Sequence, residues 1–476
     1  MTAEQRKILA VMLVPMFMSL LSVSIVNVIL PDMQRSIGAS NSAIQWVLSG
    51  YTLAFGVLLV AAGRAGDLFG RGRLFVIGVS VFALGSLISG LSPDPLVLNI
   101  ARVVMGLGSG LLSPQGVGML QQYFHGQVRG RAFGMFGTIV GVSVGIGPVL
   151  GGGLIAVLGD GWGWRSAFLI NVPIALAAII LGRFWLPKSA WIGTGTESDS
   201  DGRRRADFDP VGLVLLGVGT LLVMLPFLER GVSALVWLSF PAGLLVLGLW
   251  WTWERRYKGR GSSPMVDTAI FANKAFRNGI LIVSVYFLGA TSVWINVPLF
   301  LQMHLGHTAF EASLMGLPSS IAAAISSQIA GRYVLTLGRR MVIAGFGVAF
   351  VGLLGTTLMA GFVESGALPF WWFAAPLMLM GLSQGMTISP NQTLTLNSVD
   401  PRFGGVAGGI LQLGQRLGAA IGTAMIPGII FSLTGGGHDW LEAFTIALVI
   451  IMALTLAAMG VSFADRAREK AAPGSL

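Results

Sequence analysis

Apolar runs long enough to cross a membrane recur along the whole of this 476-residue chain. A helix needs about 20 mainly apolar residues to span the hydrocarbon core of a bilayer. Only 11% of the residues are charged, whereas a soluble domain carries about 25%. We therefore expect an all-α polytopic membrane protein with fourteen spans, at 8–30, 43–63, 74–91, 96–120, 132–157, 165–186, 210–228, 232–252, 277–303, 308–331, 340–361, 368–391, 405–433 and 440–463.

The basic residues set the expected orientation of these spans. With a cytoplasmic N-terminus, all but five of the 30 Lys and Arg fall in cytoplasmic segments. The exceptions are Arg35, Arg165 and Arg230 outside, and Arg102 and Arg416 within spans. The formal charge of +10 therefore reflects membrane topology and does not indicate nucleic-acid binding. Both termini are predicted to be cytoplasmic, in a multi-pass protein of the cell membrane.

Several function classes are excluded by residues that the sequence lacks. Without cysteine there are no disulfides and no thiolate chemistry. The four histidines are scattered and form no HExxH pattern, so no metal site is predicted, and no other cofactor is indicated. No GxxxxGK[ST] phosphate loop is present, which argues against an ATP-driven pump. An enzyme is therefore not expected.

An internal repeat divides the chain. "GRAGDLFGRGR" (63–73) ends the second predicted span and "GRYVLTLGRR" (331–340) ends the tenth. Glycines four residues apart also occur in both the fifth and the thirteenth span. Each feature recurs eight spans later, which corresponds to six spans plus an inserted pair. The predicted organisation is an N-terminal half (1–186), a cytoplasmic loop (187–209), two inserted helices (210–252), a second loop (253–276), a C-terminal half (277–464) and a cytoplasmic tail (465–476).

The first copy of this repeat resembles the loop motif of the major facilitator superfamily, in its fourteen-span drug/proton antiporter branch of actinobacterial type. The residues in register with the motif are Gly63, Asp67, Gly70 and Arg71, followed by Arg73. The resemblance implies a major facilitator fold and a cytoplasmic latch. Asp67 would cap a neighbouring helix N-terminus or pair with the arginines. The alternative is a simple turn whose arginines only set the topology.

Two further motifs extend the resemblance. "GIGPVLGGG" (145–153) is similar to the family's antiporter motif, with Gly147, Pro148, Gly151 and Gly152 in the matching positions. Pro148 removes a helix hydrogen bond, while the glycines allow close helix contact. A packing helix of another membrane protein is the alternative. "ARVVMGLGSG" (101–110) resembles the fourth-span motif, whose arginine, here Arg102, the family ties to proton transfer.

The first span departs from the family pattern. "LSVSIVNVILP" (21–31) resembles the first-span motif, but Ser22 stands where the family usually has a proton-titrated Asp. The predicted spans place no acidic residue near the bilayer midplane. Asp32 and Glu311, at the outer ends of spans, are the remaining candidate proton sites. A solvated rim is the alternative role for both.

Polar residues inside the spans are the candidate lining of a substrate cavity. The set is Ser22, Ser24, Asn27, Arg102, Asn296, Gln302, Gln384, Asn391, Gln412, Gln415 and Arg416. Two buried cations without a fixed carboxylate would favour an anionic or zwitterionic small-molecule substrate. For each amide, a hydrogen bond between helices is the alternative.

The resulting prediction is a monomeric secondary transporter in the lipid bilayer, which exports small amphipathic compounds by alternating access in the manner of multidrug efflux. Family resemblance implies proton antiport. The alternatives are uncoupled or differently coupled movement of an organic anion or lipid, and a transporter-like protein that no longer pumps.

Overall fold

The computed structural model describes residues 1–193, 209–229 and 234–471, and in these ranges helices are the only regular secondary structure. The α-helices are α1 (Ala3–Ile37), α2 (Asn41–Phe69), α3 (Arg71–Leu91), α4 (Pro95–Tyr123), α5 (Gly126–Leu169), α6 (Asn171–Trp185), α7 (Pro210–Leu228), α8 (Ser239–Gly259), α9 (Lys274–Leu299), α10 (Ala309–Leu314), α11 (Gly316–Leu337), α12 (Arg339–Glu364), α13 (Ala374–Asn397), α14 (Gly404–Gly435) and α15 (Trp440–Ala471). Short helical turns include η1 (Lys188–Trp191), η4 (Thr268–Ala272), η6 (Phe370–Phe373) and η7 (Pro401–Phe403), and η5 (Phe300–His304) is a π-helical turn.

Glycine and capping residues set several helix boundaries. Thr2 and Gln5 form a capping box at the start of α1, and Ser40 caps α2. Gly159 has a φ of +74°, which breaks the helical path inside α5. That break separates two candidate membrane spans, Gly126–Gly159 and Gly161–Trp185. The predicted spans 132–157 and 165–186 lie within these limits to about a residue.

Twelve helices of the described residues are long and apolar enough to cross a membrane, so this is a multi-pass membrane protein. The prediction of fourteen spans differs at α11 and α13, which are not among the twelve. Their lengths of 22 and 24 residues correspond to about 33 and 36 Å. Their composition explains the difference, because both helices carry many Ser, Thr, Asn and Gln residues.

The predicted boundaries of span 368–391 are shifted in the structure. Phe370–Phe373 forms a separate 3₁₀ turn, and α13 begins at Ala374 and continues past Pro390 to Asn397. Residues 194–208 of the predicted loop 187–209 and residues 472–476 of the predicted tail lie outside the described part of the chain.

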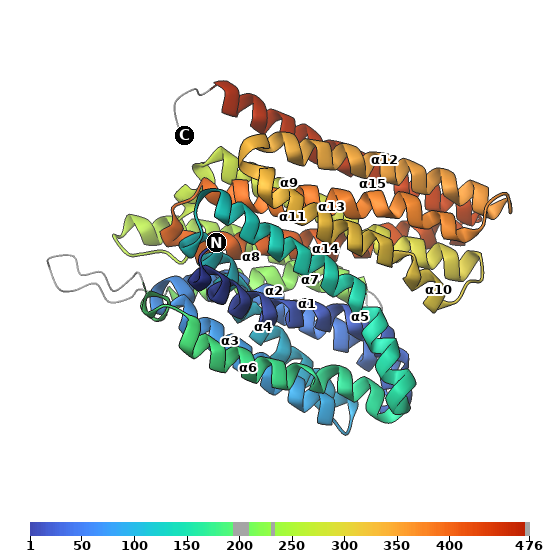
Figure 1. Cartoon of the computed structure of the whole chain (residues 1–476), viewed down its shortest axis with the longest axis horizontal. Coiled ribbons are helices and arrows are strands. Elements are labelled where there is room, and N and C mark those ends of the chain that lie inside the picture. The colour runs from blue at the N-terminus through green and yellow to red at the C-terminus, as the bar shows by residue number, and fades with distance from the viewer. Residues whose placement is uncertain (194–208, 230–233, 472–476) are drawn as a thin grey trace. The chain divides into compact units, whose positions relative to one another are not determined.

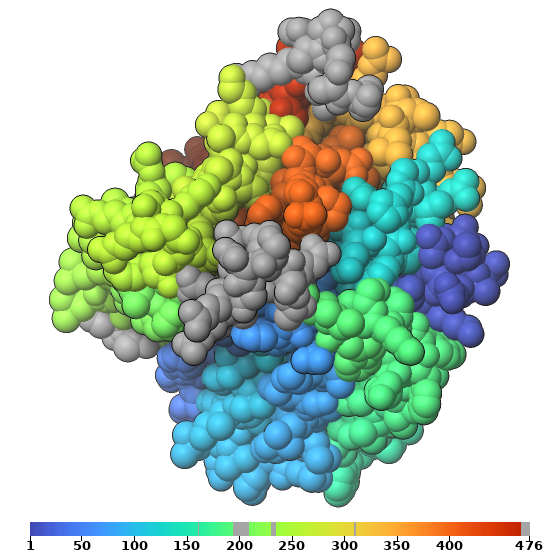
Figure 2. Space-filling view, turned by 90° about the vertical axis from the view of Figure 1, so that its left-hand side faces the viewer, coloured from blue at the N-terminus to red at the C-terminus, as the bar shows by residue number. Residues whose placement is uncertain are grey.

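The chain forms two compact units. Unit 1 comprises residues 1–125, 146–272 and 399–413, and unit 2 comprises 126–145, 273–398 and 414–476. Helices α5 and α14 therefore contribute to both units. Figure 1 shows each unit as a bundle of helices, and Figure 2 gives a space-filling view turned by 90° about the vertical axis.

Close glycine contacts and stacked aromatic rings both contribute to the packing inside the units. In unit 1, a Cβ at Gly108 of α4 would lie 2.4 Å from the backbone N of Phe82 in α3, so these helices touch backbone to backbone. In unit 2, the rings of Phe300 and Phe444 stack at 4.5 Å, and Phe373 packs edge-on against Phe300. Glycines such as Gly108 thus allow close helix contact.

Candidate functional site

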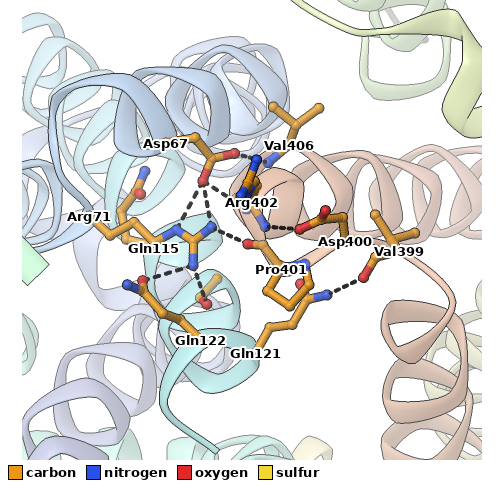
Figure 3. A network of polar contacts seen from close by, with 12 residues as sticks. Asp67, Arg71, Gln115, Gln121, Gln122, Val399, Asp400, Pro401, Arg402 and Val406 are labelled. Atoms are coloured by element: carbon orange, nitrogen blue, oxygen red, sulfur yellow. Dashed lines mark hydrogen bonds and ion pairs between the residues drawn. The ribbon is translucent and has the colours of Figure 1, made fainter. Parts of the chain in front are cut away.

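Asp67, near the end of α2, caps the N-terminus of α14. Its two carboxylate oxygens accept hydrogen bonds from the backbone N–H groups of Gly405 and Val406, each at 3.1 Å. These are the second and third residues of α14, whose N–H groups have no partner within the helix. A side-chain cap normally comes from the helix's own preceding residue. Here it comes from a residue 338 positions away, which is only 4% exposed (Figure 3).

Arg71, the first residue of α3, holds this carboxylate in place. Its Nε and Nη2 lie 2.9 and 2.8 Å from Asp67 Oδ1. Its remaining donors reach the carbonyls of Gly118 at 2.6 Å and Pro401 at 2.9 Å, and the amide oxygen of Gln122 at 3.0 Å. The buried ion pair is therefore surrounded by further hydrogen bonds, as such pairs require. It joins α2, α3 and α4 to the chain that enters α14 (Figure 3).

Glycines allow the close approach that these bonds need. A Cβ at Gly63 would lie 2.3 Å from the carbonyl oxygen of Gly405, and one at Gly405 would lie 2.6 Å from Asp67 Oδ1. Gly70 has a φ of +101°, which an L side chain rarely adopts, and it makes the turn between α2 and α3. Of the five predicted motif residues, Arg73 is exposed and lies apart from this network.

Sequence reasoning did not assign the α4 residues of this network. Gln121 donates to the carbonyl of Val399 at 3.1 Å, and Gln122 accepts from Arg71 (Figure 3). Both follow directly after the predicted span 96–120. Two adjacent glutamines at the end of a span were the sequence feature that could have indicated polar contacts there. Gln115 spans α4 and α2 through a 2.7 Å bond to the carbonyl of Ala62.

The predicted antiporter motif packs against α1. A Cβ at Gly147 would lie 2.5 Å from Ser24 Oγ, and one at Gly151 would lie 3.1 Å from side-chain atoms of Ile25. Pro148 lies inside the helix, between these glycines. Gly152 has open space where a side chain would project. The motif thus presents one tightly packed face.

Five predicted cavity residues belong to unit 1. Ser22 is 1% exposed and accepts a hydrogen bond from Asn171 Nδ2 at 3.3 Å. Ser24 faces Gly147, and Asn27 is exposed. Gln412 is buried, and its side-chain amide nitrogen, Nε2, has no hydrogen-bond partner among the described residues.

Arg102 is the fifth predicted cavity residue of unit 1. Within the described residues, its side-chain contacts include no carboxylate. Its Nε donates to the carbonyl of Val47 at 2.9 Å. The guanidinium lies 4.3 Å from the ring centre of Tyr51 and 5.7 Å from that of Phe168. These contacts are cation–π interactions, and the side chain is 1% exposed. The tyrosine hydroxyl in turn bonds Ser109 Oγ at 2.6 Å, which fixes the ring.

The remaining cavity candidates belong to unit 2. Asn296 of α9 is fully buried, and neither of its amide atoms has a partner among the described residues. Gln302 lies in η5 and is exposed, and Gln384 is half-buried. Gln415 and Arg416 are half-buried on α14, and Gln415 Nε2 has no partner in the described chain.

Asn391, the last of these candidates, belongs to a second network that sequence reasoning missed. It accepts from Arg339 Nη1 and donates to the carbonyl of Gly279 at 2.9 Å. Arg339 also pairs with Asp465 at 2.7 Å, and Asp465 accepts from Asn278 at 2.8 Å. The predicted last span ended at 463, which left this acid outside the membrane segment. The internal repeat could have indicated this network, because Arg339 occupies the position in the second copy that Arg71 occupies in the first.

The two candidate proton sites have different surroundings. Asp32 is buried on α1 and pairs with Arg35. Glu311 forms a capping box with Thr308 at the start of α10. Hydrogen bonds from the backbone N–H and the hydroxyl of Thr308 lower the pKa of Glu311 below the ordinary range of glutamate. His307 lies 3.6 Å from the same carboxylate.

Fold and site together show a helical multi-pass membrane protein in which a buried ion pair caps the N-terminus of α14. The sequence profile of the Major Facilitator Superfamily matches residues 12–207, 210–423 and 279–475. The chain belongs to this family of transporters, so it is a secondary transporter and not an enzyme, as the sequence predicted.

Relatives and a solved structure agree with this assignment. The chain is 32% identical over 431 residues to a protein named probable actinorhodin transporter from Streptomyces coelicolor, covering 90% of this chain and 72% of the relative. It is 31% identical over 421 residues to multidrug resistance protein Stp from Mycobacterium tuberculosis, covering 87% and 74%. The predicted relation to actinobacterial efflux proteins is therefore confirmed.

The solved structure of the human organic anion transporter MFSD10 shares the fold, with a TM-score of 0.68 and 12% identity over 97% of this chain and 100% of that one. The predicted major facilitator fold is confirmed at this level.

Proposed function

We propose that this protein exports small amphipathic organic compounds by alternating access. Two relatives, one named a probable actinorhodin transporter and the other a multidrug resistance protein, support this proposal. The observation that carries the proposal is the Asp67 cap on α14. The bonds to Gly405 and Val406 join the two sequence halves, and a transport cycle would break and remake them. Such a latch has a clear use in a protein that alternates between two states.

The membrane arrangement is part of this proposal. Spans α11 and α13 would complete fourteen crossings, with the boundaries 1–186, 210–252 and 277–464 for the two halves and the inserted pair. Positive charge in the loops supports cytoplasmic termini. We propose a monomer.

The cavity residues are proposed as substrate contacts. Asn296, Gln412 and Gln415 support this role, because each has a buried amide atom without a partner among the described residues. An unsatisfied buried polar group costs about 1–3 kcal/mol, which a bound substrate group would offset. Arg102, a buried cation of unit 1 held by a carbonyl and two rings, supports the proposal of an anionic or zwitterionic substrate.

This proposal includes two alternatives for how substrate movement is coupled to an energy source. Family resemblance implies proton antiport, with Asp32 or Glu311 as the titrating group. Ser22, hydrogen-bonded to Asn171 where an acid is usual, favours uncoupled or differently coupled transport of an organic anion or lipid. A protein that no longer pumps is the remaining alternative.

The test is reconstitution of the full chain in liposomes that enclose a pH-sensitive dye. Anionic and lipophilic cationic fluorescent substrates are offered with and without a proton gradient. We expect the anionic substrate to move and the cationic one to be excluded. Failure to move any of a broad substrate panel would favour the protein that no longer pumps, and preference for the cation would overturn the substrate class.

A further inference from the structure

The inserted helix α8 is attached to the rest of unit 1 by one face. A Cβ at Gly243 would lie 2.7 Å from the backbone N of Val223 in α7, so the two helices pack closely there. The exposed surface of α8 carries Leu244, Leu245 and Leu249, which are 50%, 71% and 60% exposed. In a multi-pass membrane protein, acyl chains cover an apolar face of this kind.

Acidic side chains near the C-terminal end of α8 already have partners. Glu254 is fully buried and accepts a 2.8 Å hydrogen bond from the indole N–H of Trp250. Asp267 pairs with Lys258 at 2.8 Å. Neither carboxylate is therefore available to neutralise further basic residues of this helix end.

Three arginines at this end are exposed, namely Arg255, Arg256 and Arg260. Across the described ranges, no carboxylate lies within ion-pair distance of any of them. The surface that α8 and the following residues form is coloured yellow-green in Figure 2 and faces the viewer. A cluster of exposed guanidinium groups attracts anions.

The order of residues along the exposed face matches the layers of a bilayer. Leu245, Leu249, Thr252 and Arg256 follow one another at helical spacing. The rise from Leu249 to Arg256 is about 10 Å, which spans the boundary between acyl chains and phosphates. Trp251 packs on Phe271 at 5.4 Å between these depths, where aromatic rings gather in membrane proteins.

We propose that Arg255, Arg256 and Arg260 form a binding site for the phosphates of anionic phospholipids. Guanidinium groups bind phosphate oxygens through paired hydrogen bonds. The leucines of α8 hold the acyl chains and the arginines hold the head groups. The inserted pair α7–α8 therefore carries a lipid site of its own, and this site is independent of whether the protein transports a drug.

The test uses the full chain and native mass spectrometry after equal exposure to phosphatidylglycerol and phosphatidylcholine. We expect wild type to retain phosphatidylglycerol preferentially. In the triple variant Arg255→Gln, Arg256→Gln, Arg260→Gln, the retained phosphatidylglycerol is expected to fall at least three-fold relative to wild type. A variant with lysine at the same three positions is expected to keep most of it, since the positive charge remains.

The matched control is the triple variant Arg277→Gln, Arg332→Gln, Arg340→Gln, which removes three exposed charges from α9, α11 and α12. It is expected to retain at least two-thirds of the wild-type signal. Equal loss in both glutamine variants, or unchanged retention in the α8 variant, would overturn the site.

If the α8 variant is not monodisperse, wild type alone decides the question. Retained phosphatidylglycerol is then measured at low and high ionic strength. The proposal requires retention to fall as salt rises, because exposed charges are screened. Retention that ignores salt would contradict a site built from these arginines.

Discussion

At the scale of single residues, Asp67 combines a helix cap on α14 with a buried ion pair to Arg71. Asp67→Asn keeps the shape of the side chain and removes the charge. It leaves the Arg71 guanidinium buried without its ion-pair partner, and loss of a buried partner costs about 3 kcal/mol. We expect a lower thermal unfolding temperature in detergent and slower transport in liposomes.

The control for this change is Asp94→Asn. Asp94 is an exposed cap on α4 and accepts from the N–H of Val97 at 2.9 Å. Asn caps a helix about as well as Asp, so the expected change is within about 0.5 kcal/mol. Equal destabilisation by the two substitutions would mean that the ion pair with Arg71 adds nothing.

At the scale of helices, the glycines of α5 are expected to differ sharply. Gly147→Ala places a Cβ 2.5 Å from Ser24 Oγ and must move α5 away from α1, at a cost of about 1–3 kcal/mol. Gly152→Ala meets open space and should stabilise α5 by up to about 1 kcal/mol through helix propensity. Melting curves of the two variants are compared, and an equal shift would contradict the packed face.

The capping box of α10 predicts a pH-dependent stability. Because its folded pKa is lowered, Glu311 stabilises the folded protein above its unfolded pKa, and this contribution is lost as pH falls through the folded pKa. Glu311→Ala should therefore lower the unfolding temperature at pH 7, and the difference from wild type should shrink at acidic pH. Glu311→Gln, which can keep the capping box, is the control. A difference that persists unchanged at acidic pH would argue against the ionised cap.

At the scale of the whole molecule, the sequence pattern predicted those structural features that depend on local composition. Run length predicted the helices. The resemblance carried by Gly63, Asp67, Gly70 and Arg71 led us to expect that Asp67 caps a neighbouring helix or pairs with an arginine, and the structure shows both contacts. The partners at Gly405 and Val406 could not be predicted, because they are set by packing between segments more than 300 residues apart. The many polar residues of α13 weaken its apolar pattern, so the predicted boundaries of this span differ from those of the helix.

Proton coupling is a property of the whole transport cycle, and Ser22 allows it to be tested. Ser22→Asp restores a titratable group at a position that is 1% exposed, beside the Asn171 amide at 3.3 Å. An ionisable residue inside a span is costly to bury, so its protonation becomes linked to the transport state. We expect substrate movement by this variant to shift the pH of the liposome lumen more than wild type does. Ser22→Asn, which cannot titrate, should behave as wild type. If wild type already moves the lumen pH as much as the aspartate variant, another group titrates, and Asp32 and Glu311 become the residues to replace.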